Sequence, residues 1–169
     1  IDGIDPQNRE GLLNAYDNSI RATDRLLSDL IQAIGQTGRS TALLYLSDHG
    51  EDILDDSRGR FLHASPTPSY YQLHIPFLIW LSPEYRERHP VESELCRLRQ
   101  RTPFDSRTVF HTLLGIAGIR TPYADARFDL SHPDFAPGER FYLGEHNRPI
   151  RLSHLPFDPQ DFAQIYGHR

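Results

Sequence analysis

The strongest candidate for chemistry in this sequence is Asp48-His49, which directly follows the apolar segment 41–47. A carboxylate oxygen and an imidazole nitrogen are both good zinc ligands. Gly50 allows the backbone to turn sharply after the pair, and Glu51 could either orient His49 or cap the following turn. Because ligands in α/β proteins gather where strands end, Asp48 and His49 are predicted to be two ligands of a metal ion.

The same dipeptide has a second interpretation that the residues leave open. Asp48 could cap the element that follows it, with His49 as an ordinary loop residue. Zinc needs three or four ligands, and the pair supplies two. The dipeptide alone therefore does not decide between a metal site and a structural cap.

Two further histidines lie in the region that follows. His63 is predicted to be catalytic and to bind substrate, because imidazole titrates near neutral pH and can transfer a proton or contact an oxyanion. His74 opens the second apolar segment and is predicted to bind substrate, with a purely structural role as the alternative. A surface role for His63 also stays open. No Gly-x-Ser-x-Gly elbow, Walker loop, dinucleotide fingerprint or zinc-knuckle spacing is present.

The elements that must position these residues are a helix, two strands and a second helix. The first helix ends near Gly35 and Gly38 and carries an apolar stripe, predicted to be buried, at steps of three and four residues. Buried strands are predicted at 41–47 and 75–81. The stripe consists of Leu13, Tyr16, Ile20, Leu27, Leu30, Ile31 and Ile34.

The remaining segments have weaker signals. Residues 57–73 show no periodicity and are predicted to form a long functional loop. Residues 83–104 are predicted to form a surface helix or loop. Asp105 or Ser106 is predicted to cap a helix through Gly118. A short strand is expected at 141–143, and Val109, Leu113, Ile116 and Ala117 are expected on the apolar side of the preceding helix. This order of elements predicts a three-layer α/β protein.

Composition excludes several classes of function. The 169 residues suit a single globular domain, and the formal net charge of −5 argues against a nucleic-acid partner. Cys96 is the only cysteine, so no internal disulfide can form. No apolar run approaches the roughly 18–20 residues of a membrane span. The absence of methionine leads us to expect that the chain is a piece of a longer protein.

Several blocks of sequence together resemble the C-terminal part of sulfatase-type phosphoethanolamine transferases, which belong to the alkaline phosphatase superfamily. The resemblance covers about residues 12–145, and Asp-His-Gly-Glu after a strand is its most specific part. The blocks are Tyr16-Asp17-Asn18-Ser19-Ile20, Leu43 to Glu51, Phe61-Leu62-His63, Gln72 to Ser82, and Phe110-His111-Thr112-Leu113-Leu114.

The resemblance implies a zinc enzyme whose site is only partly present here. In that family zinc is held by a Glu, a nucleophilic Thr and an Asp-His pair, which Asp48 and His49 match. His63 matches a histidine that holds the substrate phosphate or a second metal, so one or two zinc ions are expected. The Glu, the Thr and another histidine are expected before Ile1. Residues 1–169 would then be the C-terminal portion of a three-layer alkaline phosphatase/sulfatase-like fold, inactive by itself.

The resemblance also implies a reaction and a location. Phosphoethanolamine would pass from phosphatidylethanolamine to lipid A or another envelope glycan through a phosphothreonine. The whole protein would be anchored in the bacterial inner membrane by a preceding region and would face the periplasm. The alternatives are a sulfatase or phosphoglycerol transferase of the same superfamily, or a domain that has lost catalysis and only binds envelope components.

Overall fold

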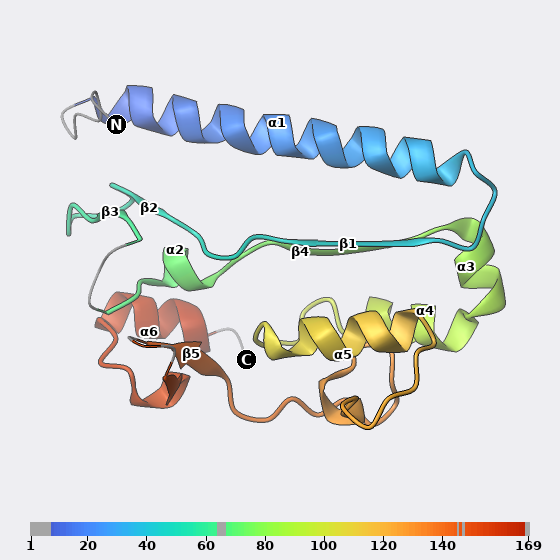
Figure 1. Cartoon of the computed structure of the whole chain (residues 1–169). Helices are drawn as coiled ribbons and strands as arrows, with labels where there is room; N and C mark the ends of the chain where they lie inside the picture. Colours follow the sequence, from blue (N-terminus) through green and yellow to red (C-terminus); the bar gives the residue numbers. More distant parts are fainter. Residues whose placement is uncertain (1–7, 64–66, 145, 147, 168–169) are drawn as a thin grey trace. The chain divides into compact units, whose positions relative to one another are not determined.

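The computed structural model describes residues 8–63, 67–144, 146 and 148–167. The chain, whose helices and strands are labelled in Figure 1, divides into two compact units. One comprises Ile1–Gln36, Tyr45–Leu78 and Pro156–Arg169, and the other Thr37–Leu44 and Ile79–Leu155. The elements are α1 (Arg9–Gly35), β1 (Ala42–Leu46), β2 (Asp52–Ile53), β3 (Phe61–Leu62), α2 (Tyr70–Leu73), β4 (Phe77–Leu81), α3 (Pro83–Arg88), α4 (Pro90–Leu98), α5 (Arg107–Ile116), η1 (Ala126–Phe128), β5 (Phe141–Leu143), β6 (Pro149–Arg151), η3 (Leu152–His154) and α6 (Pro159–Tyr166).

The long N-terminal helix that the apolar periodicity predicts is present as α1. Asn8 caps it by accepting a hydrogen bond from the backbone N–H of Gly11 at 3.1 Å, and the helix ends at Gly35, as expected. Among the described residues, none of the helices combines the length and the hydropathy that crossing a bilayer requires.

The prediction that the apolar stripe of α1 is buried is wrong. No residue of this helix is buried, and Ile20 and Leu30 are 51% and 42% exposed. The 27 residues of α1 span about 40 Å. Within its unit α1 contacts the two-residue strand β2, which is too short to cover a stripe of that length.

The two predicted apolar strands are confirmed as β1 and β4, which pair with each other. The N–H of Ser82, just after β4, donates to the carbonyl of Thr41, just before β1, at 3.0 Å. The end of one strand therefore lies beside the start of the other, so the pair is antiparallel. Both strands are half-buried rather than buried, because the described sheet has two strands and no third to flank them.

The segment predicted as a long loop contains a small hairpin and a helical turn. β2 and β3 pair antiparallel, with Asp52 opposite Leu62, and Ser69 caps α2 by accepting a hydrogen bond from Gln72 N at 3.1 Å. Two-residue strands have no sequence period, which is why the hairpin could not be predicted.

The buried residues of the first unit are mostly polar. Among its described residues, Asp52, Ser69, Gln72 and Asp161 are all less than a tenth exposed. The Ser69 hydroxyl donates to Asp52 Oδ1 at 2.7 Å, and the Gln72 carboxamide donates to Asp52 Oδ2 and, at 3.3 Å, to the carbonyl of Leu62. These bonds join β2, β3 and α2.

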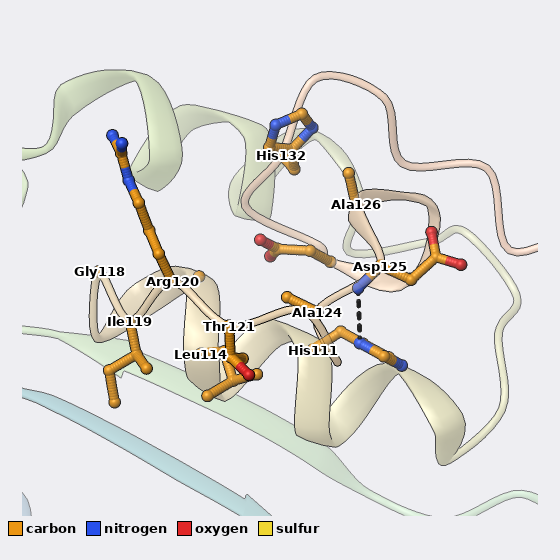
Figure 2. A pocket seen from close by; sticks show the side chains of 12 residues that line it. His111, Leu114, Gly118, Ile119, Arg120, Thr121, Ala124, Asp125, Ala126 and His132 are labelled. Atoms are coloured by element: carbon orange, nitrogen blue, oxygen red, sulfur yellow. Dashed lines mark hydrogen bonds between the residues drawn. The ribbon is translucent and has the colours of Figure 1, made fainter.

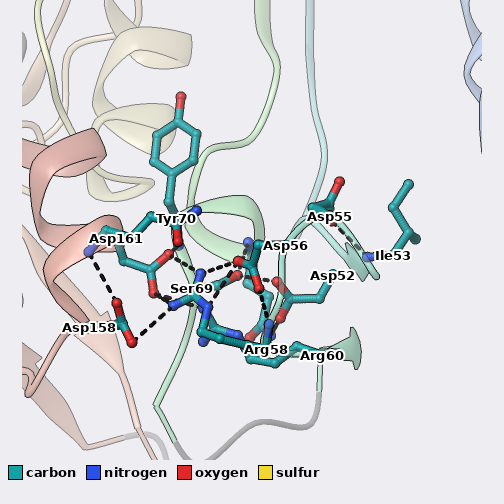
Figure 3. A network of polar contacts seen from close by, with 12 residues as sticks. Asp52, Ile53, Asp55, Asp56, Arg58, Arg60, Ser69, Tyr70, Asp158 and Asp161 are labelled. Carbon is teal, nitrogen blue, oxygen red and sulfur yellow. Dashed lines mark hydrogen bonds and ion pairs between the residues drawn. The ribbon is translucent and has the colours of Figure 1, made fainter.

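A second polar network attaches the C-terminal helix α6 to the same region (Figure 3). The carboxylate of Asp161 accepts from Arg58 Nη1 at 2.5 Å, from Arg60 Nη2 at 2.8 Å and from the backbone N–H of Tyr70 at 2.9 Å. Burial alone would raise the pKa of Asp161, but these hydrogen bonds outweigh it and lower the pKa to about 2.

The second unit has an apolar centre made of Tyr85, Ile116, Leu130 and Leu152. The Tyr85 hydroxyl donates to the carbonyl of Ile116 at 2.9 Å. The predicted helix is confirmed as α5, with Ser106 at its N-cap, but its buried face is Thr108, Thr112 and Ile116. Leu113, expected on that face, is 47% exposed.

Threonines can occupy the buried face of α5 because their hydroxyls form hydrogen bonds with backbone groups. Thr108 Oγ1 donates to the carbonyl of Asp105, and Thr112 Oγ1 accepts from Leu130 N, both at 3.0 Å. The predicted strand 141–143 is confirmed as β5, which pairs antiparallel with β6.

Replacing Asp161 with Asn tests the second network. Because Arg58 and Arg60 would lose their shared buried carboxylate, we expect the free energy of unfolding to fall by about 3 kcal/mol in urea titrations at neutral pH. Glu94→Gln, which removes an exposed ion pair with Arg97, is the matched control and should leave the urea midpoint unchanged. An unchanged midpoint in Asp161→Asn would contradict this role.

The same variant should lose a pH dependence. Since the folded pKa of Asp161, about 2, lies below the ordinary value of 3.8, its stabilisation is complete above roughly pH 4 and is lost as the pH falls through 2. The stability curve of Asp161→Asn should therefore be flatter than that of the wild type below pH 4.

Replacing Gln72 with Leu tests the first network. The buried carboxylate of Asp52 would keep Ser69 but lose its amide donor, so we expect a loss of about 2 kcal/mol in the free energy of unfolding. Gln32→Leu on the exposed side of α1 is the control for added apolar surface. Equal stability of the two variants would show that the Gln72 carboxamide does not hold the network.

Candidate functional site

The turn after β1 holds Asp48 and His49 in a defined arrangement. The backbone N–H of His49 donates to Asp48 Oδ1 at 3.1 Å, and the Ser47 hydroxyl donates to the carbonyl of His49 at 2.7 Å. The Asp48 side chain is 87% exposed and that of His49 40% exposed. Both are therefore accessible to a ligand at the end of the strand, as the sequence predicts.

Gly50 sets the path of the chain after the pair. Its N–H donates to the carbonyl of Gln72 at 2.9 Å. A Cβ atom at position 50 would lie 2.0 Å from the carbonyl oxygen of Tyr71, a distance that no side chain allows. This close backbone approach, rather than an unusual φ angle, is what requires glycine here.

The distance between the two predicted ligands fits one zinc ion. Asp48 Oδ2 lies 3.7 Å from His49 Nε2. Two ligand atoms on a tetrahedral zinc are roughly 3.4 Å apart, so a shift of a few tenths of an ångström would let both bind. His49 Nδ1 lies 3.0 Å from the carbonyl of Gly50, which can only accept; Nδ1 therefore carries the proton and Nε2 has its lone pair free for a metal.

His63 lies beside His49. The centroids of the two imidazole rings are 4.0 Å apart, with an angle of 38° between their planes. His63 Nδ1 lies 2.8 Å from Glu51 Oε1, and the same oxygen is 3.6 Å from His49 Nδ1. The structure thus brings together three residues of the predicted site, Asp48, His49 and His63, with Glu51 Oε1 near the Nδ1 atoms of both histidines.

His49, Glu51 and His63 offer ligand atoms that all lie within 4.8 Å of one another. The 2.8 Å between His63 Nδ1 and Glu51 Oε1 is a hydrogen-bond distance, shorter than the roughly 3.4 Å that separates two ligands of a tetrahedral zinc ion. We therefore take Glu51 as the partner of His63 rather than a ligand in this arrangement. Its other oxygen, Oε2, is buried and has no hydrogen-bond partner among the described residues.

Glu51 also affects the neighbouring helix. Burial first, and then the charges of Glu51 and Asp55, raise the pKa of Tyr16 on α1.

Sequence reasoning expected Glu51 to support His49 and missed its contact with His63. The sequence has no signal for this contact, because it depends on the hairpin of β2 and β3.

His74 does not join this group in the described structure. Its Nδ1 lies 2.8 Å from the hydroxyl of Tyr70, and the two rings stack with centroids 4.9 Å apart. Its ring therefore has a local partner on α2. This contact favours the structural alternative for His74 over substrate binding.

A pocket of about 550 Å³ lies elsewhere, within the second unit (Figure 2). It includes His111, whose Nδ1 accepts from the backbone N–H of Asp125 at 3.0 Å, as well as Arg120 and His132. None of the residues predicted to act in chemistry lines it.

Comparisons with known proteins identify the family of this chain. A profile of the sulfatase family matches residues 2–119. Phosphoethanolamine transferase EptA of Salmonella typhimurium is 35% identical over 131 residues, which are 74% of this chain and 23% of that protein. The chain thus spans about a quarter of this relative's length.

Solved structures show the same fold. The C-terminal periplasmic domain of EptC from Escherichia coli has a TM-score of 0.76 at 24% identity, covering 92% of this chain and 44% of that one. A zinc complex of the same domain has a TM-score of 0.75 at 24% identity, covering 95% and 44%. The integral membrane protein lipooligosaccharide phosphoethanolamine transferase A (EptA) from Neisseria meningitidis has a TM-score of 0.66 at 25% identity, covering 72% and 23%.

These likenesses confirm the predicted fold class, the α/β fold of alkaline phosphatase- and sulfatase-like domains. They also confirm the resemblance to phosphoethanolamine transferases that the blocks around Asp48-His49 indicate. Because the family profile matches well over half of its residues, the chain belongs to the sulfatase family.

Proposed function

We propose that the chain is part of a zinc-dependent transferase. It would move phosphoethanolamine from phosphatidylethanolamine to lipid A or another envelope glycan through a phosphothreonine intermediate. The observation that carries this proposal is the 3.7 Å between Asp48 Oδ2 and His49 Nε2 at the end of β1, in a chain of the sulfatase family. The names of its relatives support the transferred group, phosphoethanolamine.

Each residue of the site has a separate task in this proposal. Asp48 and His49 hold zinc, which supplies positive charge that lowers the pKa of a nucleophilic hydroxyl and stabilises phosphoryl oxygens. The Asp48 carboxylate also reduces the charge of the site, and Gly50 fixes the orientation of His49 through its carbonyl. His63, half exposed beside His49, is free to meet the phosphoryl group or its acceptor.

The remaining parts of the site would come from sequence before Ile1. A nucleophilic Thr, an acidic ligand and a further histidine are expected there. Asp48 and His49 supply too few ligands for tight binding, so residues 1–169 alone should be inactive and hold zinc weakly. The zinc complex of the Escherichia coli EptC domain and the membrane-embedded Neisseria EptA support a zinc enzyme at the periplasmic face of the inner membrane.

Replacing His49 with Ala in the full-length protein tests the function. We expect the release of diacylglycerol from labelled phosphatidylethanolamine to fall more than about 100-fold, since even residues that merely support a metal ligand cost 10–100-fold. His132→Ala, which removes a partly exposed histidine of the second unit, is the matched control and should retain the activity.

Hydrolysis of an aryl sulfate is measured in parallel. Sulfate release that depends on His49, without diacylglycerol release, would keep the site but make the enzyme a sulfatase. Failure of both reactions in the wild type would contradict an enzymatic function and favour a domain that binds envelope components.

Removal of the metal is an independent test. Dialysis against a zinc chelator should abolish diacylglycerol release, and one or two equivalents of zinc should restore it in the wild type but not in Asp48→Ala. Full activity after chelation, with no zinc found by elemental analysis, would contradict the proposal.

A further inference from the structure

The pairing of His63 with Glu51 determines which ring nitrogen is free. His63 Nδ1 lies 2.8 Å from Glu51 Oε1. An ionised carboxylate offers only acceptor atoms, so the proton of this hydrogen bond belongs to Nδ1. In the neutral ring Nε2 then carries a lone pair and no hydrogen.

The surroundings hold both partners of this bond in place. Glu51 is 23% exposed, and its Oε2 is buried. On the other side, Leu62 has a φ of +62°, in the left-handed region that a leucine rarely adopts. The carbonyl of Leu62 accepts from Gln72 Nε2 at 3.3 Å. The backbone before His63 is therefore fixed in an unfavourable conformation, and such conformations persist where the surrounding structure requires them.

We propose that Glu51 is a positioning residue that keeps His63 in the Nδ1–H tautomer, so that Nε2 meets the substrate as an electron-pair donor. This inference rests on the proposed function and makes it more specific. A neutral His63 cannot donate a hydrogen bond from Nε2 to a phosphoryl oxygen. It can take a proton from the acceptor group, or it can bind a metal ion.

Two other histidines of the chain provide internal comparisons. His111 Nδ1 accepts from the backbone N–H of Asp125 at 3.0 Å, which requires the opposite tautomer, with the proton on Nε2. His74 Nδ1 faces the hydroxyl of Tyr70, which can donate or accept, so its tautomer is not fixed by that contact. The structure therefore predicts different tautomers for His63 and His111.

Nitrogen-15 NMR of ring-labelled histidine reads these tautomers directly. The longest soluble form of the protein that contains residues 1–169 is measured without metal, at a pH where imidazole is neutral. Signals are assigned with His63→Gln and His111→Gln. We expect a protonated Nδ1 and an unprotonated Nε2 for His63, and the reverse for His111. A protonated Nε2 on His63 would overturn the proposal.

Two substitutions of Glu51 test whether this residue sets the tautomer of His63. In Glu51→Leu the carboxylate is lost, and His63 should shift toward the tautomer with the proton on Nε2; Glu94→Gln on α4 should change nothing. In the full-length enzyme, Glu51→Leu should lower kcat about 10–100-fold with little change in KM, and Glu51→Gln, which keeps an acceptor oxygen, should recover part of the loss. An unchanged His63 tautomer in Glu51→Leu would overturn the proposal.

Zinc titration of the same sample separates the two uses of Nε2. A large change of the His63 Nε2 signal that saturates with zinc identifies a metal ligand. A change confined to His49 excludes His63 as a ligand of that zinc ion and leaves proton acceptance as the use of its Nε2.

The tautomer is read without metal or substrate. A protein with the expected tautomer but no zinc binding and no transferase activity would therefore contradict the proposed function and leave the role of Glu51 intact.

Discussion

The geometry of the candidate site depends on the hydrogen bonds of one buried side chain, Gln72. Its carboxamide joins Asp52 on β2 to the carbonyl of Leu62 on β3, and the backbone carbonyl of the same residue accepts from the N–H of Gly50. Gly50 follows His49 and Leu62 precedes His63, so Gln72 sets the spacing of the two histidines. The first unit has a polar rather than an apolar centre, which makes these directional bonds the main constraint on the site.

A polar centre favours one arrangement of its side chains, but each buried group left without a hydrogen bond lowers the stability. Asp52 has two donors, and Asp161 has two arginines and a backbone N–H, so both carboxylates are satisfied in the described structure. The Oε2 atom of Glu51 is an exception, since it is buried and finds no hydrogen-bond partner in the part of the chain that the structure describes. A buried oxygen left unpaired costs about 1–3 kcal/mol. The other oxygen of Glu51 is paired with His63.

Much of the fold could be predicted from the sequence, because α1, β1, β4 and α5 have clear apolar periods or caps. The hairpin of β2 and β3 could not, since its strands are two residues long. Nor could the contact of Arg58 with Asp161, which joins residues 103 positions apart. Of the site, Asp48, His49 and His63 were predicted to act together and lie together. Glu51 was expected beside His49, and its bond to His63 arises only from the hairpin.

We propose above that Asp48 and His49 bind one zinc ion. Anomalous diffraction at the zinc edge, from crystals of the full-length protein or its complete periplasmic part grown with stoichiometric zinc, tests it most directly. We expect a peak within bonding distance of both Asp48 Oδ2 and His49 Nε2, with Glu51 still paired to His63. A zinc peak elsewhere, with both atoms free of metal, would contradict it.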